Sequence, residues 1–170
     1  ESRGLGDVYK RQPEGRTSTV THIDTTDGEV EATRAGESVV LRLADDVDLA
    51  RGDLISGADR PQATREFAAT VVALTDKDLK PGPMVHLRYG TAVVKARITQ
   101  VERTLDLDGV ADLEDPEAVT LNEIAHVVLQ TPVDLPVEDY AARGAVGNFL
   151  LVDTSTGNTL AAGFVGRRLR

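Results

Sequence analysis

Short runs of alternating apolar and polar residues recur along the chain, separated by turn residues. In one such run Val39, Leu41 and Leu43 alternate with Val40 and Arg42. A period of two is typical of a β-strand that buries one face. We therefore expect the first three side chains to face a core and the other two to face solvent.

The clearest alternation lies in residues 92–101. Val94, Ala96 and Ile98 are predicted to point inward. The intervening side chains are polar and are predicted to point outward: Lys95, Arg97 and Thr99. Residues 67–74 are apolar almost throughout, so this strand is expected to be covered on both faces.

The remaining pattern also predicts strands and turns. Further strands are expected at 16–23, 30–34, 38–43, 53–55, 84–89, 120–131, 148–152 and 159–165. Val127 and Leu129 are expected to point inward, and Asp27-Gly28 is a hairpin signal. One helical turn is expected at 137–143, because no ordinary-length segment keeps a period of 3.6.

The strand pattern predicts an all-β protein with two folded parts. Residues 13–56 are too short for a complete barrel and are expected to form the back half of one. Residues 57–66 read as a linker because Pro, Gly, Ser and Asp favour turns. Residues 67–166 are expected to form a complete six-stranded antiparallel β-barrel, since closure removes exposed strand edges. Residues 167–170 form a tail.

The first twelve residues are interpreted separately. Residues 2–12, SRGLGDVYKRQ, show no periodicity and resemble a translated sequencing adapter. We therefore expect residues 1–12 to be non-native and the native protein to extend further at its N-terminus. A natural N-terminal arm is the alternative.

Composition narrows the functional classes. The formal net charge is −9, and an acidic chain is an unusual binder of nucleic acid. The chain has no cysteine, which excludes disulfides, thiolate metal sites and a cysteine nucleophile. No apolar run has the length of a membrane span, and no secretion leader is recognised. The expected location is the cytoplasm, without nucleic-acid or membrane partners.

Recognisable catalytic motifs are missing from the sequence. It has no phosphate-binding glycine loop and no nucleophile elbow. His22, His86 and His126 are far apart and are expected to be surface or hydrogen-bonded side chains. Alternation places His126 opposite Val127 and Leu129, towards solvent or a partner. We predict no catalytic, cofactor-binding or metal-binding residue.

Three charged segments could be functional motifs, but each also fits an ordinary turn, loop or tail. Arg51-Gly52-Asp53 could be an adhesion motif, but a tight turn at Gly52 is the better interpretation. The acidic residues between 106 and 117 lack the spacing of a calcium loop and are expected to be a solvated loop. The basic end at 167–170 is a candidate anion contact or a loose tail. The residues alone thus indicate a soluble all-β binding or assembly module.

Several motifs add a family resemblance. Residues 15–20, 23–28 and 39–55 resemble the late part of domain II in elongation-factor-Tu-like GTPases. Residues 81–98, 121–127, 149–153 and 159–165 resemble strands of domain III in the large, GTPase subunit of bacterial sulfate adenylyltransferase (ATP sulfurylase). Ala125 stands where that subunit usually has glycine. The resemblance covers residues 13 to about 166.

The resemblance implies a function in sulfate assimilation. The parent enzyme makes adenosine 5′-phosphosulfate and pyrophosphate from ATP and sulfate, with adenylyl transfer on a small subunit. The large subunit hydrolyses GTP, and its GTP and Mg²⁺ would be bound by a G domain that this chain lacks. The implied partners are the small catalytic subunit and that G domain. This piece would be their platform and, alone, not an enzyme.

Two other interpretations stay open. The chain could be a fragment of a translation factor that binds aminoacyl-tRNA, or a stand-alone β-barrel interaction module. The sequence does not decide whether an adenylylsulfate kinase follows in the parent, nor whether the piece is stable alone. Exposed strand residues such as Lys95, Arg97 and His126 are candidates for the contact with the small subunit.

Overall fold

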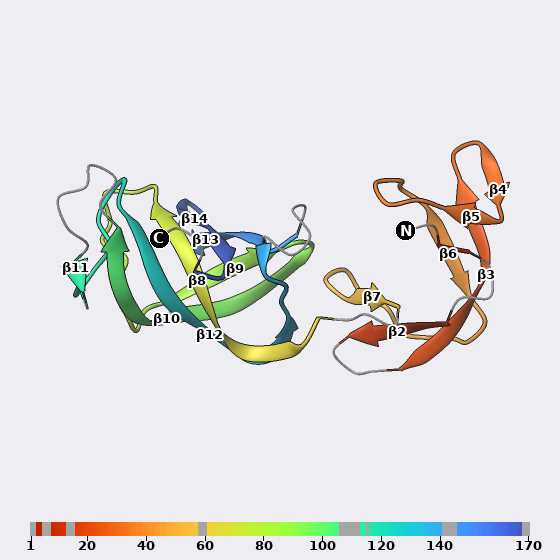
Figure 1. Ribbon diagram of the computed structural model, residues 1–170, viewed down its shortest axis with the longest axis horizontal. Coiled ribbons are helices and arrows are strands. Elements are labelled where there is room, and N and C mark those ends of the chain that lie inside the picture. The colour runs from red at the N-terminus through yellow and green to blue at the C-terminus, as the bar shows by residue number, and fades with distance from the viewer. Residues whose placement is uncertain are drawn as a thin grey trace. The chain divides into compact units, whose positions relative to one another are not determined.

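The chain forms two compact units, residues 1–60 and 61–170, in a computed structural model (Figure 1). The structure describes residues 16–57, 61–105, 116–140 and 146–167, together with the backbone of strands at 3–4, 8–12 and 113–114. Each unit is described by itself.

The second unit is a closed barrel. Its strands are β8 (Ala63–Ala73), β9 (Met84–Tyr89), β10 (Ala92–Leu105), β12 (Ile124–Pro136), β13 (Asn148–Asp153) and β14 (Thr159–Val165). They pair antiparallel in the order β10-β12-β8-β14-β13-β9, and β9 pairs again with β10 (Figure 1). The short β11 (Leu113–Glu114) pairs with the end of β10. The predicted six-stranded barrel is confirmed.

Alternation along the strands fills the barrel interior. Ala96 and Ile98 are buried, while Lys95, Arg97 and Thr99 point outward and are exposed. The largest fully buried apolar side chains of this unit are Leu87, Leu129, Leu151, Val71, Val119 and Val127. The inward and outward predictions for β10 and for Val127 and Leu129 are therefore confirmed.

Two strands begin at other residues than predicted. β8 begins at Ala63 rather than residue 67, because β12 continues beyond a bulge and Leu135 pairs with Thr64. β12 begins at Ile124 rather than residue 120, because Asn122 has a φ of 66°, which ends the extended chain. Of the helical turn expected at 137–143, residues 137–139 are not helical, Tyr140 is helical, and residues 141–143 lie outside the described residues.

Asp153 fastens the turn between β13 and β14. Its Oδ1 accepts hydrogen bonds from the Ser155 N–H (2.8 Å), the Ser155 hydroxyl (2.5 Å) and the Thr156 N–H (3.1 Å). Its Oδ2 lies 2.7 Å from Lys77 Nζ. Lys77 and these local donors hold the pKa of the Asp153 carboxyl well below its ordinary value of 3.8.

This carboxylate makes the barrel sensitive to acid. Because the folded pKa of Asp153 is lowered, its stabilisation is complete above about pH 5 and is lost progressively as pH falls further. We expect the melting temperature of the wild type to drop more steeply between about pH 5 and 3 than that of Asp153→Asn. Lys77→Met keeps the Ser155 and Thr156 donors, so the acid-induced drop in its melting temperature should be intermediate between those of the wild type and Asp153→Asn. Identical pH profiles for all three would contradict the assignment.

The first unit contains a five-stranded open sheet and a separate pair of short strands. In the larger sheet β3 (Thr17–Thr25) pairs with β4 (Gly28–Val30) and β6 (Val40–Leu43), and β7 (Leu54–Ser56) lies at the other edge. The short β5 (Ala32–Thr33) belongs to the separate pair. Val20 and Ile23 are the buried centre of this unit. Partly buried neighbours pack on them: Val30, Val39, Leu41, Leu43 and Ile55. The inward face predicted for 39–43 is confirmed, and Thr25 pairs with Gly28 across the predicted hairpin.

Residues before the first predicted strand also take part in pairing. The backbone of β2 (Val8–Gln12) pairs with β3 and with β7, and β1 (Arg3–Gly4) pairs with β5. The sequence pattern gave no sign of these strands. Whether residues 1–12 are native stays a prediction.

Candidate functional site

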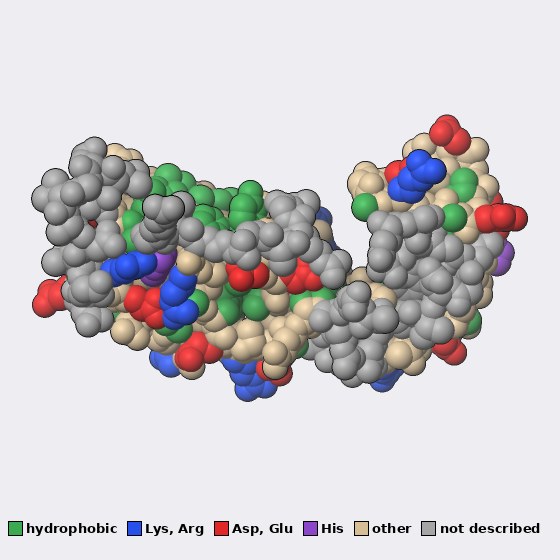
Figure 2. Space-filling view, in the orientation of Figure 1, with side chains coloured by type: hydrophobic (Ala, Val, Ile, Leu, Met, Phe, Trp, Pro, Cys, Tyr) green, Lys and Arg blue, Asp and Glu red, His purple; other side chains and the backbone are tan. Residues whose placement is uncertain are grey.

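The outside of the barrel carries an unusually apolar surface on β12, β8, β14 and β13. Cross-strand pairing aligns Ile124 with Val72, Val72 with Ala162, and Ala162 with Leu150. Leu150 is 39% exposed, and Leu74 beyond the end of β8 is 48% exposed. We call Val72, Leu74, Ile124, Leu150, Ala162 and Phe164 the apolar face. Figure 2 shows hydrophobic side chains gathered where Figure 1 labels β13 and β14.

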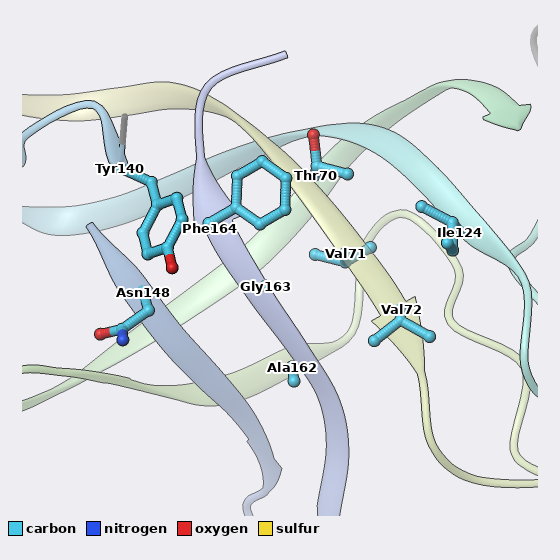
Figure 3. Close-up of a pocket in the computed structure, with 9 residues that line it drawn as sticks. All are labelled: Thr70, Val71, Val72, Ile124, Tyr140, Asn148, Ala162, Gly163 and Phe164. Carbon is cyan, nitrogen blue, oxygen red and sulfur yellow. The ribbon is translucent and has the colours of Figure 1, made fainter. Parts of the chain in front are cut away.

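A pocket of about 350 Å³ opens on this face (Figure 3). Its lining comes from strands far apart in sequence: Thr70, Val71, Val72, Ile124, Tyr140, Asn148, Ala162, Gly163 and Phe164. The rings of Tyr140 and Phe164 lie side by side with centroids 5.4 Å apart. The Thr70 hydroxyl donates to the Gly166 carbonyl at 2.8 Å and is thereby occupied.

The pocket is suited to binding rather than to chemistry. Its lining is aliphatic and aromatic apart from Thr70, Asn148 and the Tyr140 hydroxyl. It offers no nucleophile paired with a base and no carboxylate pair, which acid–base or covalent catalysis would need. An apolar side chain of a docked protein surface is the kind of group that it can take.

A polar cluster of Glu102, Arg103, His126 and Arg167 lies next to the apolar face. His126 is aligned with Thr70, and Thr70 with Phe164. Arg103 Nε donates to His126 Nδ1 at 3.2 Å, and Nε and Nη2 of Arg167 donate to the two carboxylate oxygens of Glu102. The Arg167 hydrogen bonds hold the pKa of Glu102 below its ordinary value, and Glu102 in turn raises the pKa of Arg167.

His126 was expected to be a surface or hydrogen-bonded side chain, and the surface alternative is wrong while the hydrogen-bonded one is confirmed. The side chain does point opposite Val127 and Leu129, but it is only 2% exposed. Arg103 crosses from the neighbouring strand, where a bulge between Val101 and Arg103 shifts the register. Long side chains on adjacent strands can therefore cover an outward-facing residue, which alternation within one strand does not reveal.

The other sequence-predicted candidates do not come together. His22 lies on the first unit, 3.9 Å from Glu29, and His86 is half-buried on β9. Gly52 has a φ of 110°, as the predicted turn requires. The acidic stretch lies outside the described residues except near Glu117, and of the basic end only Arg167 is described.

Among the described residues, no group of three or more His, Asp and Glu side chains is placed to hold a metal ion. Within the same part of the chain, no helix is long and apolar enough to cross a membrane. The apolar face itself was not predicted. The apolar run at 67–74 was expected to be covered on both faces, and this is wrong, because Val72 is only partly buried and Leu74 is 48% exposed.

Curated relatives match nearly the whole chain. The bifunctional enzyme CysN/CysC of Mycobacterium tuberculosis is 37% identical over 164 residues, which are 95% of this chain and 27% of that protein. Sulfate adenylyltransferase subunit 1 of Teredinibacter turnerae is 34% identical over 160 residues, 94% of this chain and 34% of that protein. The same subunit of Methylorubrum extorquens is 36% identical over 164 residues, with shares of 95% and 34%. The chain thus spans about a third of the length of these relatives.

Solved structures agree on the fold. Sup35 complexed with GDP superimposes with a TM-score of 0.87 at 24% identity, over 99% of this chain and 42% of that one. Sup35 complexed with GMPPNP gives a TM-score of 0.88 at 25% identity, with the same coverage. A family model described as GTP-eEF1A C-terminal domain-like matches residues 66–166, which make up the barrel. The chain therefore belongs to the GTP-eEF1A C-terminal domain-like family.

Proposed function

We propose that this chain is the β-barrel part of the large, GTP-hydrolysing subunit of sulfate adenylyltransferase. The observation that carries the proposal is the similarity to sulfate adenylyltransferase subunit 1, which extends over 94–95% of the chain at 34–36% identity. The whole enzyme converts ATP and sulfate to adenosine 5′-phosphosulfate and pyrophosphate. Its place is the cytoplasm, in sulfate assimilation.

In this role the barrel is a rigid platform. The described residues supply packing surfaces, and the resemblance assigns adenylyl transfer to the small subunit. GTP and Mg²⁺ belong to the G domain of the parent. The apolar face, with its pocket and the exposed Leu74 and Leu150, is the surface on which we place that G domain.

A graft into a complete relative tests the proposal. The matching barrel of Teredinibacter turnerae subunit 1 is replaced by residues 61–170 of this chain, and the chimera is combined with the small subunit of that organism. We expect GTP-stimulated formation of adenosine 5′-phosphosulfate, because the grafted surfaces contact both partners. Released pyrophosphate and the nucleotide product are measured with and without GTP.

The barrel of sup35 is the matched control, since it has the same fold at 24% identity. That graft should fold but should not support GTP-dependent synthesis. Equal activity of both grafts would show that the fold alone suffices and would remove the support for a specific role. A folded but inactive graft of residues 61–170 would contradict the proposal directly.

A further inference from the structure

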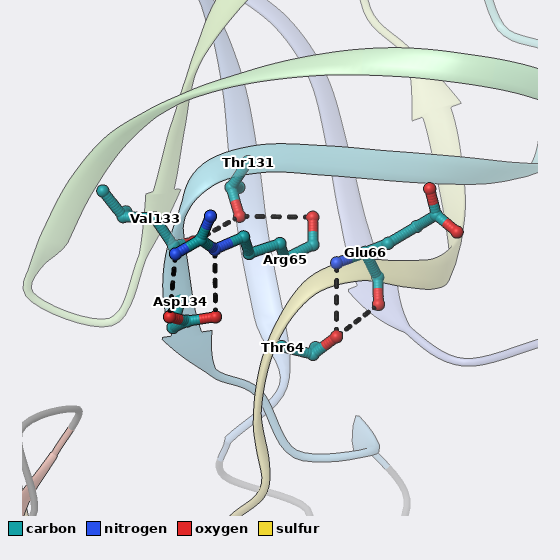
Figure 4. Close-up of polar contacts among 6 residues, drawn as sticks. All are labelled: Thr64, Arg65, Glu66, Thr131, Val133 and Asp134. Carbon is teal, nitrogen blue, oxygen red and sulfur yellow. Dashed lines mark hydrogen bonds and ion pairs between the residues drawn. The ribbon is translucent and has the colours of Figure 1, made fainter.

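Most cationic side chains of the described barrel have a partner of opposite charge or a histidine. Arg65 is typical, because its Nε and Nη2 lie 3.1 and 3.2 Å from the two carboxylate oxygens of Asp134 (Figure 4). The other such pairs are Lys77–Asp153, Lys80–Asp78, Arg103–His126 and Arg167–Glu102. Among the described barrel residues, Arg88, Lys95 and Arg97 differ, because no carboxylate forms an ion pair with them.

These cations lie on one face of two paired strands. β9 and β10 align Arg88 with Val93, His86 with Lys95, and Met84 with Arg97. Residues on alternate positions of a strand are roughly 7 Å apart, so the cations form a row on adjacent strands. We call Met84, His86, Arg88, Val93, Lys95 and Arg97 the β9–β10 face. Its inward neighbours, Val85, Leu87, Ala96 and Ile98, are buried in the core.

The β9–β10 face has little internal compensation for its charge. Arg97 donates from Nη2 to Gln130 Oε1 at 2.6 Å, and this amide is neutral. Glu66, aligned with Gln130 on the next strand, is the nearest acid along that row. Like charges gathered on one sheet face repel one another, so the row costs stability unless an anionic surface covers it. The chain as a whole is acidic, with a formal net charge of −9.

Exposed apolar side chains mark the two ends of this cationic row. Val93 is 56% exposed and Met84 is 44% exposed. Protein interfaces are enriched in Met and Arg, whereas contacts to nucleic acid are dominated by cations against phosphate. The face also lacks an outward aromatic ring for stacking on bases. These features favour a protein partner over a polyanion.

We propose that the β9–β10 face binds an acidic surface of the small subunit of sulfate adenylyltransferase. The identity of the partner rests on the proposed function, and the location and its charge rest on the geometry of β9 and β10. The cations would steer association and fix orientation, while Met84 and Val93 would be covered at the ends of the contact.

The test measures binding of the whole 170-residue chain to the purified small subunit by calorimetry, at about 50 mM and 300 mM salt. The wild type should bind more weakly at the higher salt. The double variant Lys95→Glu/Arg97→Glu should bind at least about tenfold more weakly at the lower salt and lose most of the salt dependence. Arg51→Glu, which reverses an exposed cation on the other unit, should bind like the wild type. The milder Lys95→Gln/Arg97→Gln should be intermediate, which guards against a folding defect.

The outcomes separate this inference from the proposed function. Unchanged binding by the double variant would overturn the assignment of this face, while an active graft would still support the proposed function. If the wild type does not bind the small subunit, the identification of that subunit as the partner is wrong. Binding of a single-stranded oligonucleotide that the double variant loses would assign the face to a polyanion and also overturn the proposal.

Discussion

Gly163→Ala is expected to destabilise the barrel by about 3 kcal/mol, at the upper end of the usual cost of overpacking. A Cβ built at Gly163 would lie 2.6 Å from Phe149 Cζ and 2.7 Å from the Thr70 carbonyl oxygen. Neither neighbour can move easily. Phe149 packs edge-on against Phe67, with ring centroids 6.3 Å apart, and Thr70 belongs to the strand paired with Gly163.

Thermal unfolding of the variant and the wild type checks this result, and a shift in melting temperature of more than about 10 °C is expected for a unit of this size. Ala162→Val is the matched control, because that side chain faces the open pocket and has room to grow. The double variant Gly163→Ala/Phe149→Leu should recover part of the loss, since it removes the far end of the ring. A fully tolerated alanine at residue 163 would show that β8 and β14 are less tightly held.

Leu129→Ala should cost about 2–5 kcal/mol, because it leaves a cavity in the barrel interior. Leu129 is fully buried and is aligned with Ile98 on one side and Phe67 on the other. Side chains in a closed barrel cannot collapse into such a gap without moving several strands.

Leu150→Ala is the paired control, with the same chemistry on the apolar face. Because Leu150 is already 39% exposed, its truncation should cost well under 1 kcal/mol in the isolated chain. Chemical denaturation with a common slope for all variants measures both effects. Equal losses for the two leucines would contradict the inward and outward placement of these strands.

Sequence periodicity predicted the barrel well because each strand buries one face. The alternation in β10 placed Ala96 and Ile98 inside and Lys95 and Arg97 outside, as observed. Strand ends were less predictable, since β8 reaches back to Ala63 only because β12 bulges and continues alongside it. That pairing depends on residues about 70 positions away, which a local pattern does not contain.

The candidate surfaces also depend on strand neighbours that a local sequence pattern does not contain. The cations of the β9–β10 face could be placed outside from alternation alone, but their lack of carboxylate partners depends on which strands are neighbours. Alternation also placed His126 outside, but the side chain is buried because Arg103 on the neighbouring strand covers it. The pocket joins Thr70 to Phe164 and Tyr140, three segments that only barrel closure brings together.

Barrel closure also sets a constraint on synthesis. β8 is the first barrel strand to leave the ribosome, yet one of its two neighbours is β14, and the Thr70 hydroxyl bonds to a carbonyl 96 residues later. At about 5–20 residues per second, roughly 5–20 s pass before that neighbour exists. During this interval the apolar edge of β8 is open to other nascent strands. Chaperone demand in a cell should therefore be greatest while the last two strands are being translated.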